Sequence, residues 1–222
     1  MDLAAAWPPF GLRLRHQELE LRPATDHDAV LIASWIPDLL PADQRYFMPH
    51  LFRSINADTP EEMTHLELQW IWRQRADMTP DDWGISLTVV VDGEPVGVQG
   101  LQAVGFRVRR TIGSGSFLVS GRRRTGIGTR ARAMMLLLAF DHLGALAAES
   151  GYMDGNDASR IVSERLGYLP NGVRFQDFEG IRCRENRLLL EADRWHSTRA
   201  AWLDEVDIEG ASALCRQLDI HR

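Results

Sequence analysis

The sequence contains no lysine, and all 25 of its basic side chains are arginine. A Schiff-base enzyme needs a lysine amine as its nucleophile, and a P-loop NTPase needs a lysine on its phosphates. Both classes are therefore excluded. A GC-rich genome, which favours arginine codons, is a sufficient cause of this bias.

Cysteines and long apolar runs are also scarce. Cys183 and Cys215 are the only cysteines and lie in no metal or redox spacing, so we expect reduced thiols, no metal site and a cytoplasmic location. No apolar run approaches the ~18 residues of a membrane span. The first residues lack the basic start and apolar stretch of a signal peptide. With a net charge of −6, nothing predicts binding to nucleic acid or a membrane surface.

The pattern of turns and periodicities predicts an α+β fold. We expect one mixed, mostly antiparallel sheet with helices on both faces, in three α/β/α layers. The expected domain covers residues 1–195, and a helical tail, 196–222, packs on it. Expected strands are 19–22, 85–91, 95–101, 107–111, 114–119, 146–152, 175–178 and 187–190, and expected helices are 26–36, 60–75, 129–142 and 157–166.

The most informative segment runs from Phe117 to Phe140, where a strand enters a Gly/Arg-rich loop that opens an apolar helix. Gly126 and Gly128 allow a sharp turn whose N–H groups point outward, and three consecutive arginines, 122–124, add positive charge. A diphosphate is the ligand that such a loop suits. The plain alternative is an arginine-rich turn before a core helix.

Three phosphate-binding motifs compete for this loop. A Walker A loop fails because Ile127 stands where lysine is required. Gly126-Ile-Gly-Thr-Arg-Ala131 fits the G-x-G-x-x-A of a Rossmann fingerprint, with Glu149 near the spacing of a ribose-binding acid. The antiparallel strands expected before it argue against a dinucleotide-binding fold. The third motif is Arg123-x-x-Gly126-x-Gly128.

That third motif resembles the R/Q-x-x-G-x-G/A signature of the GNAT superfamily of N-acyltransferases. The resemblance resumes at Asn156-Asp-Ala-Ser-Arg-Ile-Val-Ser-Glu-Arg-Leu-Gly-Tyr168, so it has two motifs in the correct order and spans about 19–195. It is nearest to the branch that acetylates ribosomal-protein N-termini. The 92–93 and 97–100 segments also resemble relatives that accept succinyl-CoA.

The resemblance implies a binding site for acetyl-CoA or succinyl-CoA. In this family, the strand before the loop splays from its neighbour at a bulge and pairs with the pantetheine amides. The implied contacts with the acyl-CoA are made by Phe117, Leu118, Val119, Arg123, Arg124, Thr125, Gly126, Ile127, Gly128, Thr129, Asn156, Ser159 and Ser163. Asn156 equally suits a helix cap, and Ser159 suits either the thioester sulfur or a local backbone contact.

The resemblance implies direct attack of an amine on the thioester within a ternary complex. Gly113 stands where relatives often carry a glutamate, and Ser163 where some use a tyrosine as the general acid. We predict Glu149 as the catalytic base, with Asp154 next, and Ser159 beside the departing thiolate. A structural role for Glu149 stays open.

The acceptor is less defined than the donor. We expect its pocket to be built from 37–58, the following helix and the C-terminal hairpin. The candidate residues are Tyr46, Phe47, His50, Trp70, Trp83 and Phe175, although scattered aromatic residues more often belong to the core. A protein N-terminus, a lysine side chain, a polyamine and an aminoglycoside all remain open. A succinyl group would need a cation, for which Arg109, Arg110 and Arg174 are candidates. An acyl-CoA binder without catalysis, an inert member of the fold and a homodimer also remain open.

Overall fold

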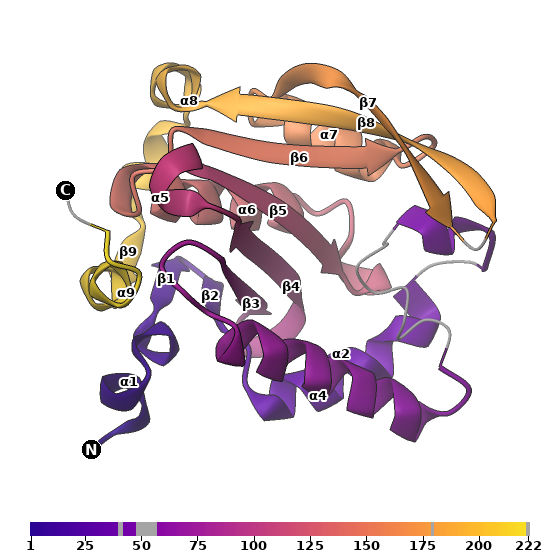
Figure 1. Cartoon of the computed structure of the whole chain (residues 1–222), viewed down its shortest axis with the longest axis horizontal. Helices are drawn as coiled ribbons and strands as arrows, with labels where there is room; N and C mark the ends of the chain where they lie inside the picture. The colour runs from indigo at the N-terminus through magenta and orange to yellow at the C-terminus, as the bar shows by residue number, and fades with distance from the viewer. Residues whose placement is uncertain (40–41, 48–56, 179, 221–222) are drawn as a thin grey trace.

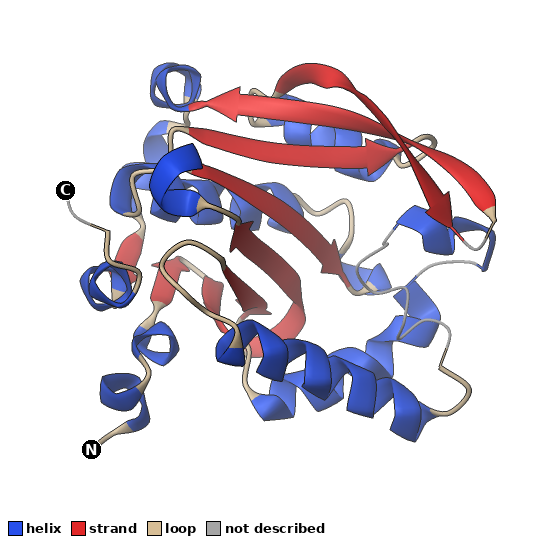
Figure 2. Ribbon diagram, in the orientation of Figure 1, coloured by secondary structure: helices blue, strands red, loops and turns tan. Residues whose placement is uncertain are grey.

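The computed structural model describes residues 1–39, 42–47, 57–178 and 180–220. Its centre is a nine-stranded sheet in the order β7-β8-β6-β5-β4-β3-β2-β1-β9 (Figures 1 and 2). The strands are β1 Arg13–His16, β2 Leu19–Pro23, β3 Trp83–Val91, β4 Glu94–Ala103, β5 Thr111–Leu118, β6 Ala147–Met153, β7 Leu169–Phe178, β8 Ile181–Glu191 and β9 Asp207–Glu209. Only the β5–β6 pair is parallel among these strands.

Helices cover both faces of the sheet, which confirms the expected α+β class. The helices are α1 Leu3–Ala6, α2 Asp26–Leu39, α4 Pro60–Ala76, α5 Phe106–Arg109, α6 Ile127–Leu137, α7 Asp157–Arg165, α8 Ala192–Thr198 and α9 Ala211–Gln217, and a π-helical turn, Leu138–His142, prolongs α6. In Figure 1, α2 and α4 lie side by side below the sheet, and α6 and α7 lie behind it.

Local sequence signals set most of these boundaries. The Thr59 side chain caps α4 by accepting a hydrogen bond from the Glu62 N–H, and Pro60 occupies its first turn. Asp92 and Gly93 both have positive φ, as the tight turn between β3 and β4 requires. The main core forms where α6 packs on the sheet, with Met134, Met135 and other fully buried side chains.

Four expectations about the strands need correction. Residues 107–110 do not form a strand, because 106–109 make the helical turn α5 and Arg110 adopts positive φ, and β5 begins at Thr111. The C-terminal hairpin is much longer than expected and turns near Gly180. The segment before residue 19 contributes the unexpected strand β1. Residues 207–209 form β9, which pairs with β1 and so places this part of the tail in the sheet.

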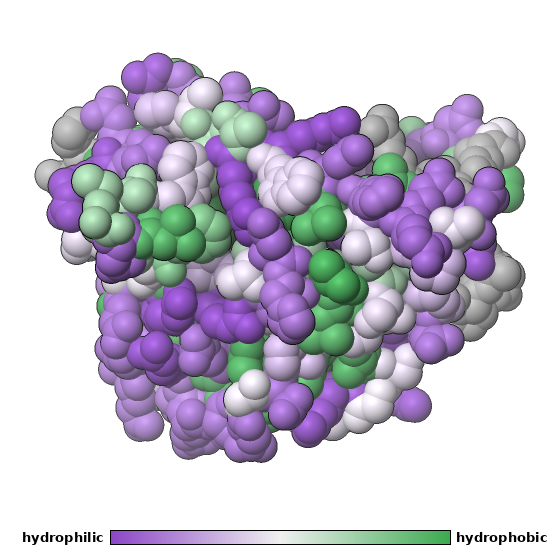
Figure 3. Space-filling view, turned by 90° about the horizontal axis from the view of Figure 1, so that it is seen from below, coloured by the Kyte–Doolittle hydropathy of each residue, from purple (hydrophilic) through white to green (hydrophobic). Residues whose placement is uncertain are grey.

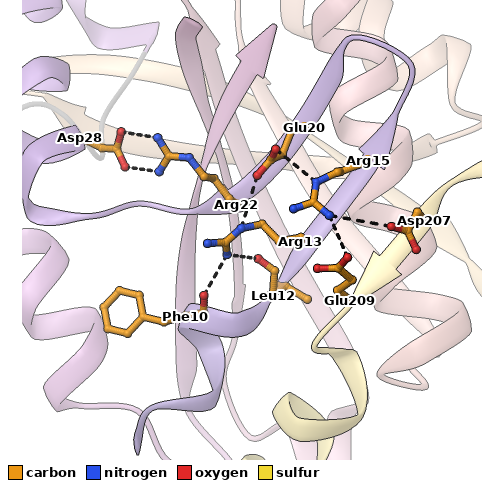
Figure 4. A network of polar contacts seen from close by, with 9 residues as sticks. All are labelled: Phe10, Leu12, Arg13, Arg15, Glu20, Arg22, Asp28, Asp207 and Glu209. Carbon is orange, nitrogen blue, oxygen red and sulfur yellow. Dashed lines mark hydrogen bonds and ion pairs between the residues drawn. The ribbon is translucent and has the colours of Figure 1, made fainter. Parts of the chain in front are cut away.

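Arginine–carboxylate pairs join these outer strands to their surroundings (Figure 4). Arg15 reaches Glu20 on β2 and Glu209 on β9. Arg22 makes two hydrogen bonds, of 2.5 and 2.9 Å, to the carboxylate of Asp28 in the first turn of α2. Asp28 is buried, so this pair anchors α2 to the sheet.

Candidate functional site

The two parallel strands β5 and β6 diverge after a short pairing. They pair at three positions, ending at Gly113 opposite Glu149. Beyond that point, β5 stays paired with β4 through Leu118, and β6 stays paired with β8 through Met153. The inner backbone edges of 114–118 and 150–153 therefore face a gap, which we call the β5–β6 gap.

The gap confirms the expected splay but not the expected bulge. The β4–β5 register is continuous from Gly97 opposite Leu118 to Ala103 opposite Ile112, so no extra residue is inserted. The two strands separate because each follows its own outer neighbour. A side chain at Gly97 would place its Cβ 2.3 Å from the Phe117 carbonyl oxygen, so only glycine lets β4 and β5 approach this closely beside the gap.

The loop after β5 presents a row of backbone donors. The N–H groups of Arg122 and Arg123 donate to Val119 and Ser120 carbonyls, whereas those of residues 124–128 have no backbone acceptor in the described part of the chain. Arg124 and Gly126 have φ of 60° and 87°, which turns successive N–H groups toward one side. Together with the N-terminus of α6, they form a site suited to an anion.

The Arg123 guanidinium lies away from this row of donors. It donates to the Leu118 carbonyl at 2.9 Å and to the Leu39 carbonyl at 2.5 Å, which joins the end of β5 to the end of α2. Burial lowers the pKa of Arg123 from its ordinary value. Its predicted cofactor contact therefore rests on the backbone, whereas the Arg122 and Arg124 side chains are exposed and available to phosphates.

The start of α7 lies against the wall of the gap. Asn156 caps the helix, because its side-chain oxygen accepts a hydrogen bond from the Ser159 N–H at 3.2 Å. The Ser159 hydroxyl lies 3.4 Å from the Gly151 carbonyl of β6. Ser163, one turn further on, is fully buried. The cap role of Asn156 is confirmed, and the cofactor roles of these residues stay predictions.

Side chains of the predicted pantetheine strand are used in packing. Phe117 is buried in a cluster with α2 and α4, and Leu118 and Val119 pack on the main core. Ile127 is also buried in the main core. The packing of these side chains leaves the backbone of the strand for a contact with a cofactor.

Glu149 lies at the apex of the β5–β6 gap, at the opposite end of β5 from the loop. Its carboxylate forms ion pairs with Arg187 at 3.3 Å and Arg109 at 3.9 Å. Asp154, at the far end of β6, accepts a hydrogen bond from Asn186 at 2.6 Å. Both predicted bases are thus engaged in polar contacts, and their catalytic roles stay predictions.

A cavity of about 140 Å³ lies between the sheet and α2 and α4. We call it the α4 pocket. It reaches the β5–β6 gap at Ser114 and Gly115, and its wall includes the buried carboxylate of Glu67. The other residues that line it are Ile32, Trp70, Ile71, Gln74, Ser86, Val98, Gly100, Gln102 and Phe117.

Glu67 is the residue that the sequence interpretation missed. It is only 3% exposed, although glutamate is seldom buried. The signal was present, because Met63, Glu67 and Ile71 follow one another at four-residue spacing and are the buried residues of α4. A glutamate inside an apolar stripe indicates a carboxylate that faces the interior.

The aromatic residues predicted for the acceptor pocket lie in different parts of the structure. Trp70 lines the α4 pocket, as expected. Trp83 is a core residue, 4% exposed, that packs edge-on against Phe106, as the core-packing alternative predicted. Phe175 is half exposed on β7 beneath the Arg182 guanidinium, and Phe47 packs near Met153. The Tyr46 side chain and His50 lie outside the described residues.

The described residues contain no cluster of three or more potential metal ligands. Among the same residues, no helix has the length and hydrophobicity required to cross a bilayer. Comparison with protein families gives a match to the acetyltransferase (GNAT) domain over residues 18–169, more than half of the chain. The chain belongs to the GNAT acetyltransferase family.

Solved structures of GNAT proteins share the fold. Ribosomal-protein-S5-alanine acetyltransferase from Vibrio fischeri is 18% identical, with a TM-score of 0.63, and the match covers 82% of this chain and 98% of that one. RimJ from Mycobacterium smegmatis in complex with CoA disulfide is 18% identical, with a TM-score of 0.64 and coverage of 95% and 96%. A GNAT protein from Brucella melitensis is 20% identical, with a TM-score of 0.65 and coverage of 86% and 84%.

Membership of the GNAT family decides between the alternatives for the loop. The dinucleotide-binding alternative fails, because its parallel βαβ series is absent from a described sheet with a single parallel pair. The loop at 119–129 lies within the region that matches the family model, and it follows the splayed strand that the family resemblance implied.

Proposed function

We propose that this chain transfers an acetyl group from acetyl-CoA to a primary amine by direct attack in a ternary complex. One observation carries the proposal: the β5–β6 gap joins an anion site at one end to the α4 pocket at the other. The row of N–H groups at 124–128 suits the diphosphate. The unpaired strand edges suit the amides of a pantetheine arm, and the pocket suits an amine.

Groups of the protein then position the two substrates, polarise the thioester carbonyl and accept the amine proton. A backbone N–H of 114–118 polarises the thioester carbonyl as negative charge develops on its oxygen. We propose Glu67 as the group that takes the amine proton, directly or through water, because it is a buried carboxylate in the pocket wall. Glu149, which pairs with Arg109 and Arg187 at the apex of the gap and lies outside the pocket, has the weaker claim.

Acetyl suits this site better than succinyl does. A succinyl carboxylate needs an available cation near the thioester, and each candidate already has a partner. Arg109 pairs with Glu149, Arg174 pairs with Glu185, and the Arg110 guanidinium donates to the Gly144 carbonyl at 2.9 Å. None of these three predicted cations is therefore free for a succinyl carboxylate, which favours the acetyl group.

The acceptor is proposed only as a primary amine, on a small molecule or on a protein. A protein N-terminus is one candidate, because proteins of the same fold include a ribosomal-protein-S5-alanine acetyltransferase. Figure 3 shows the lower side of the molecule, where hydrophobic side chains run between polar ones. Trp70 and Trp72 of α4 are exposed by 41% and 48%, which leaves apolar surface for an acceptor beside the pocket.

Calorimetric titration with acetyl-CoA, succinyl-CoA and NAD tests the donor. We expect acetyl-CoA to bind most tightly and NAD to give no heat. An acceptor screen with acetyl-CoA then includes N-terminal peptides, lysine, polyamines and aminoglycosides. Tight binding of acetyl-CoA with no transfer to any amine would favour the non-catalytic alternative, and binding of NAD alone would contradict the proposal.

A further inference from the structure

Arg132 on α6 is a buried cation that the proposed function leaves without a role. It is 3% exposed, and burial lowers its pKa from the ordinary value. Arginine is almost never buried unless it is paired with an acid. Within the described part of the chain no carboxylate pairs with Arg132, whose guanidinium instead donates to two serine hydroxyls.

These two serines lie on opposite sides of the β5–β6 gap. Ser116 belongs to the splayed part of β5 and accepts from Arg132 at 2.9 Å. Ser163 belongs to α7, the helix that contacts β6 through Ser159, and accepts at 3.0 Å. The guanidinium therefore bridges the two elements that flank the gap, on the face opposite the α4 pocket.

Two hydrogen-bonding positions at this place are unfilled. The Arg132 Nε and the Gln99 side-chain oxygen are buried without a hydrogen-bond partner among the described residues, and the Ser114 and Tyr168 hydroxyls lie close to each other. Burial raises the pKa of Tyr168, although Arg132 and Ser114 act against this from close by. Tyr168 therefore stays neutral and does not cancel the charge. Unfilled buried polar groups beside a cleft indicate that a ligand or water completes them.

Ser163 stands where some GNAT relatives are expected to place a tyrosine acid, but its hydroxyl is already used. Its oxygen accepts from Arg132, and its hydrogen is directed to the Ser159 carbonyl at 3.1 Å. The chain therefore holds a permanent cation, rather than a proton donor, behind this position. An uncompensated buried charge destabilises a fold, so its presence at a site needs a reason.

We propose that Arg132 stabilises the thiolate that leaves when the acetyl group is transferred. The inference rests on the proposed function. The amine nitrogen bonds to the thioester carbon, the amine gives its proton to the base, and the C–S bond breaks with its electron pair moving to sulfur. CoA thus leaves as a thiolate and takes a proton from solvent after release. A fixed positive charge favours the thiolate without any proton donor.

The test measures the thiol pKa of bound CoA by thiolate absorbance in wild type, Arg132→Met and Arg132→Lys. We expect wild type to hold this pKa about one unit or more below that of free CoA. Arg132→Met is expected to restore the free value and lower kcat about tenfold, the equivalent of one pKa unit. Arg132→Lys, which keeps the charge, is expected to retain most of the shift.

Desulfo-CoA is the matched control ligand, because it lacks the sulfur and should bind wild type and Arg132→Met equally. An unchanged thiol pKa in Arg132→Met would overturn the inference and leave the proposed function intact. Failure of wild type to bind CoA would overturn both. If Arg132 has only a structural role, Arg132→Met will lower the unfolding temperature of the protein and leave the thiol pKa of bound CoA unchanged. If Arg132→Met does not fold, Arg132→Gln, which keeps hydrogen bonds to the serines, replaces it.

Discussion

The cofactor side and the acceptor side of this molecule are built on different principles. On the cofactor side, the loop at 119–129 and the gap edges present backbone groups, with the exposed side chains of Arg122 and Arg124 beside them. On the acceptor side, the α4 pocket presents side chains from five elements, α2, α4, β3, β4 and β5, which are spread along the sequence. A binding site made of backbone groups is therefore encoded by a compact sequence motif, whereas a site made of side chains is encoded by residues scattered along the sequence.

The sharpest test of this contrast changes one pocket side chain. We expect Glu67→Gln to lower kcat by about 100-fold, since a positioned base contributes at least that much, and to leave acetyl-CoA affinity unchanged. Steady-state kinetics and calorimetry measure both quantities. Glu61→Gln, on the exposed first turn of the same helix, is the matched control. Unchanged kcat in Glu67→Gln would show that the pocket lacks the base.

The support of the acceptor side is tested through Asp28, which anchors α2. Asp28→Asn is expected to lower the free energy of unfolding by about 2 kcal/mol near neutral pH, because it leaves Arg22 partly buried without its acid. Urea unfolding measures this loss. Asp26→Asn, which breaks an exposed pair with Arg75, should cost much less.

The same pair predicts a pH dependence. Burial raises the pKa of Asp28, but the hydrogen bonds from Arg22 and Thr25 outweigh it and hold the pKa below its ordinary value. The Asp28 contribution is therefore fully present above about pH 4, the unfolded pKa, and is lost as pH falls through the folded pKa. Wild type and Asp28→Asn should converge in stability on acidification. A constant difference down to low pH would contradict this assignment.

On the cofactor side, a substitution that alters the backbone conformation of the loop should weaken acetyl-CoA binding more than the loss of any one loop side chain. Gly126 has φ of 87°, and a residue with a side chain there costs about 1–2 kcal/mol in the left-handed region. We expect Gly126→Val to weaken acetyl-CoA binding about tenfold or more by calorimetry. Gly121→Ala, where an added Cβ meets nothing within 4 Å, is the control and should bind normally. Equal affinities would show that loop conformation does not form the site.

The smallest effect is expected at Glu149. Because its ion pairs with Arg109 and Arg187 are partly exposed, Glu149→Gln should change stability by less than about 1 kcal/mol. We expect turnover to change by less than about fivefold, the factor that corresponds to 1 kcal/mol. A large loss of kcat with unchanged cofactor affinity would instead restore Glu149 as the base and move the proton acceptor from the pocket to the apex of the gap.

Local signals explain why much of the fold was predictable. Thr59 and Pro60 start α4, Asp92-Gly93 turns β3 into β4, and Asn156 caps α7, each through interactions within a few residues. The strand predicted at 107–111 failed because Arg110 adopts positive φ, a conformation that its sequence neighbours do not reveal. Strand β9 was missed because it pairs with β1, which is distant in sequence. Strand β1 forms a hairpin with the adjacent β2, so its signal was local and the sequence interpretation overlooked it.

The sequence by itself determined the GNAT loop, its helix and the α+β class, because glycine positions, caps and periodicity act locally. Only the tertiary structure decided that β5 and β6 separate beyond Gly113, since that depends on pairing with two other strands. The tertiary structure also decided which acidic and basic side chains lie close to the β5–β6 gap. Glu67 lies in a pocket and Arg132 is buried beside serines of β5 and α7, because packing brings together residues that are distant in sequence.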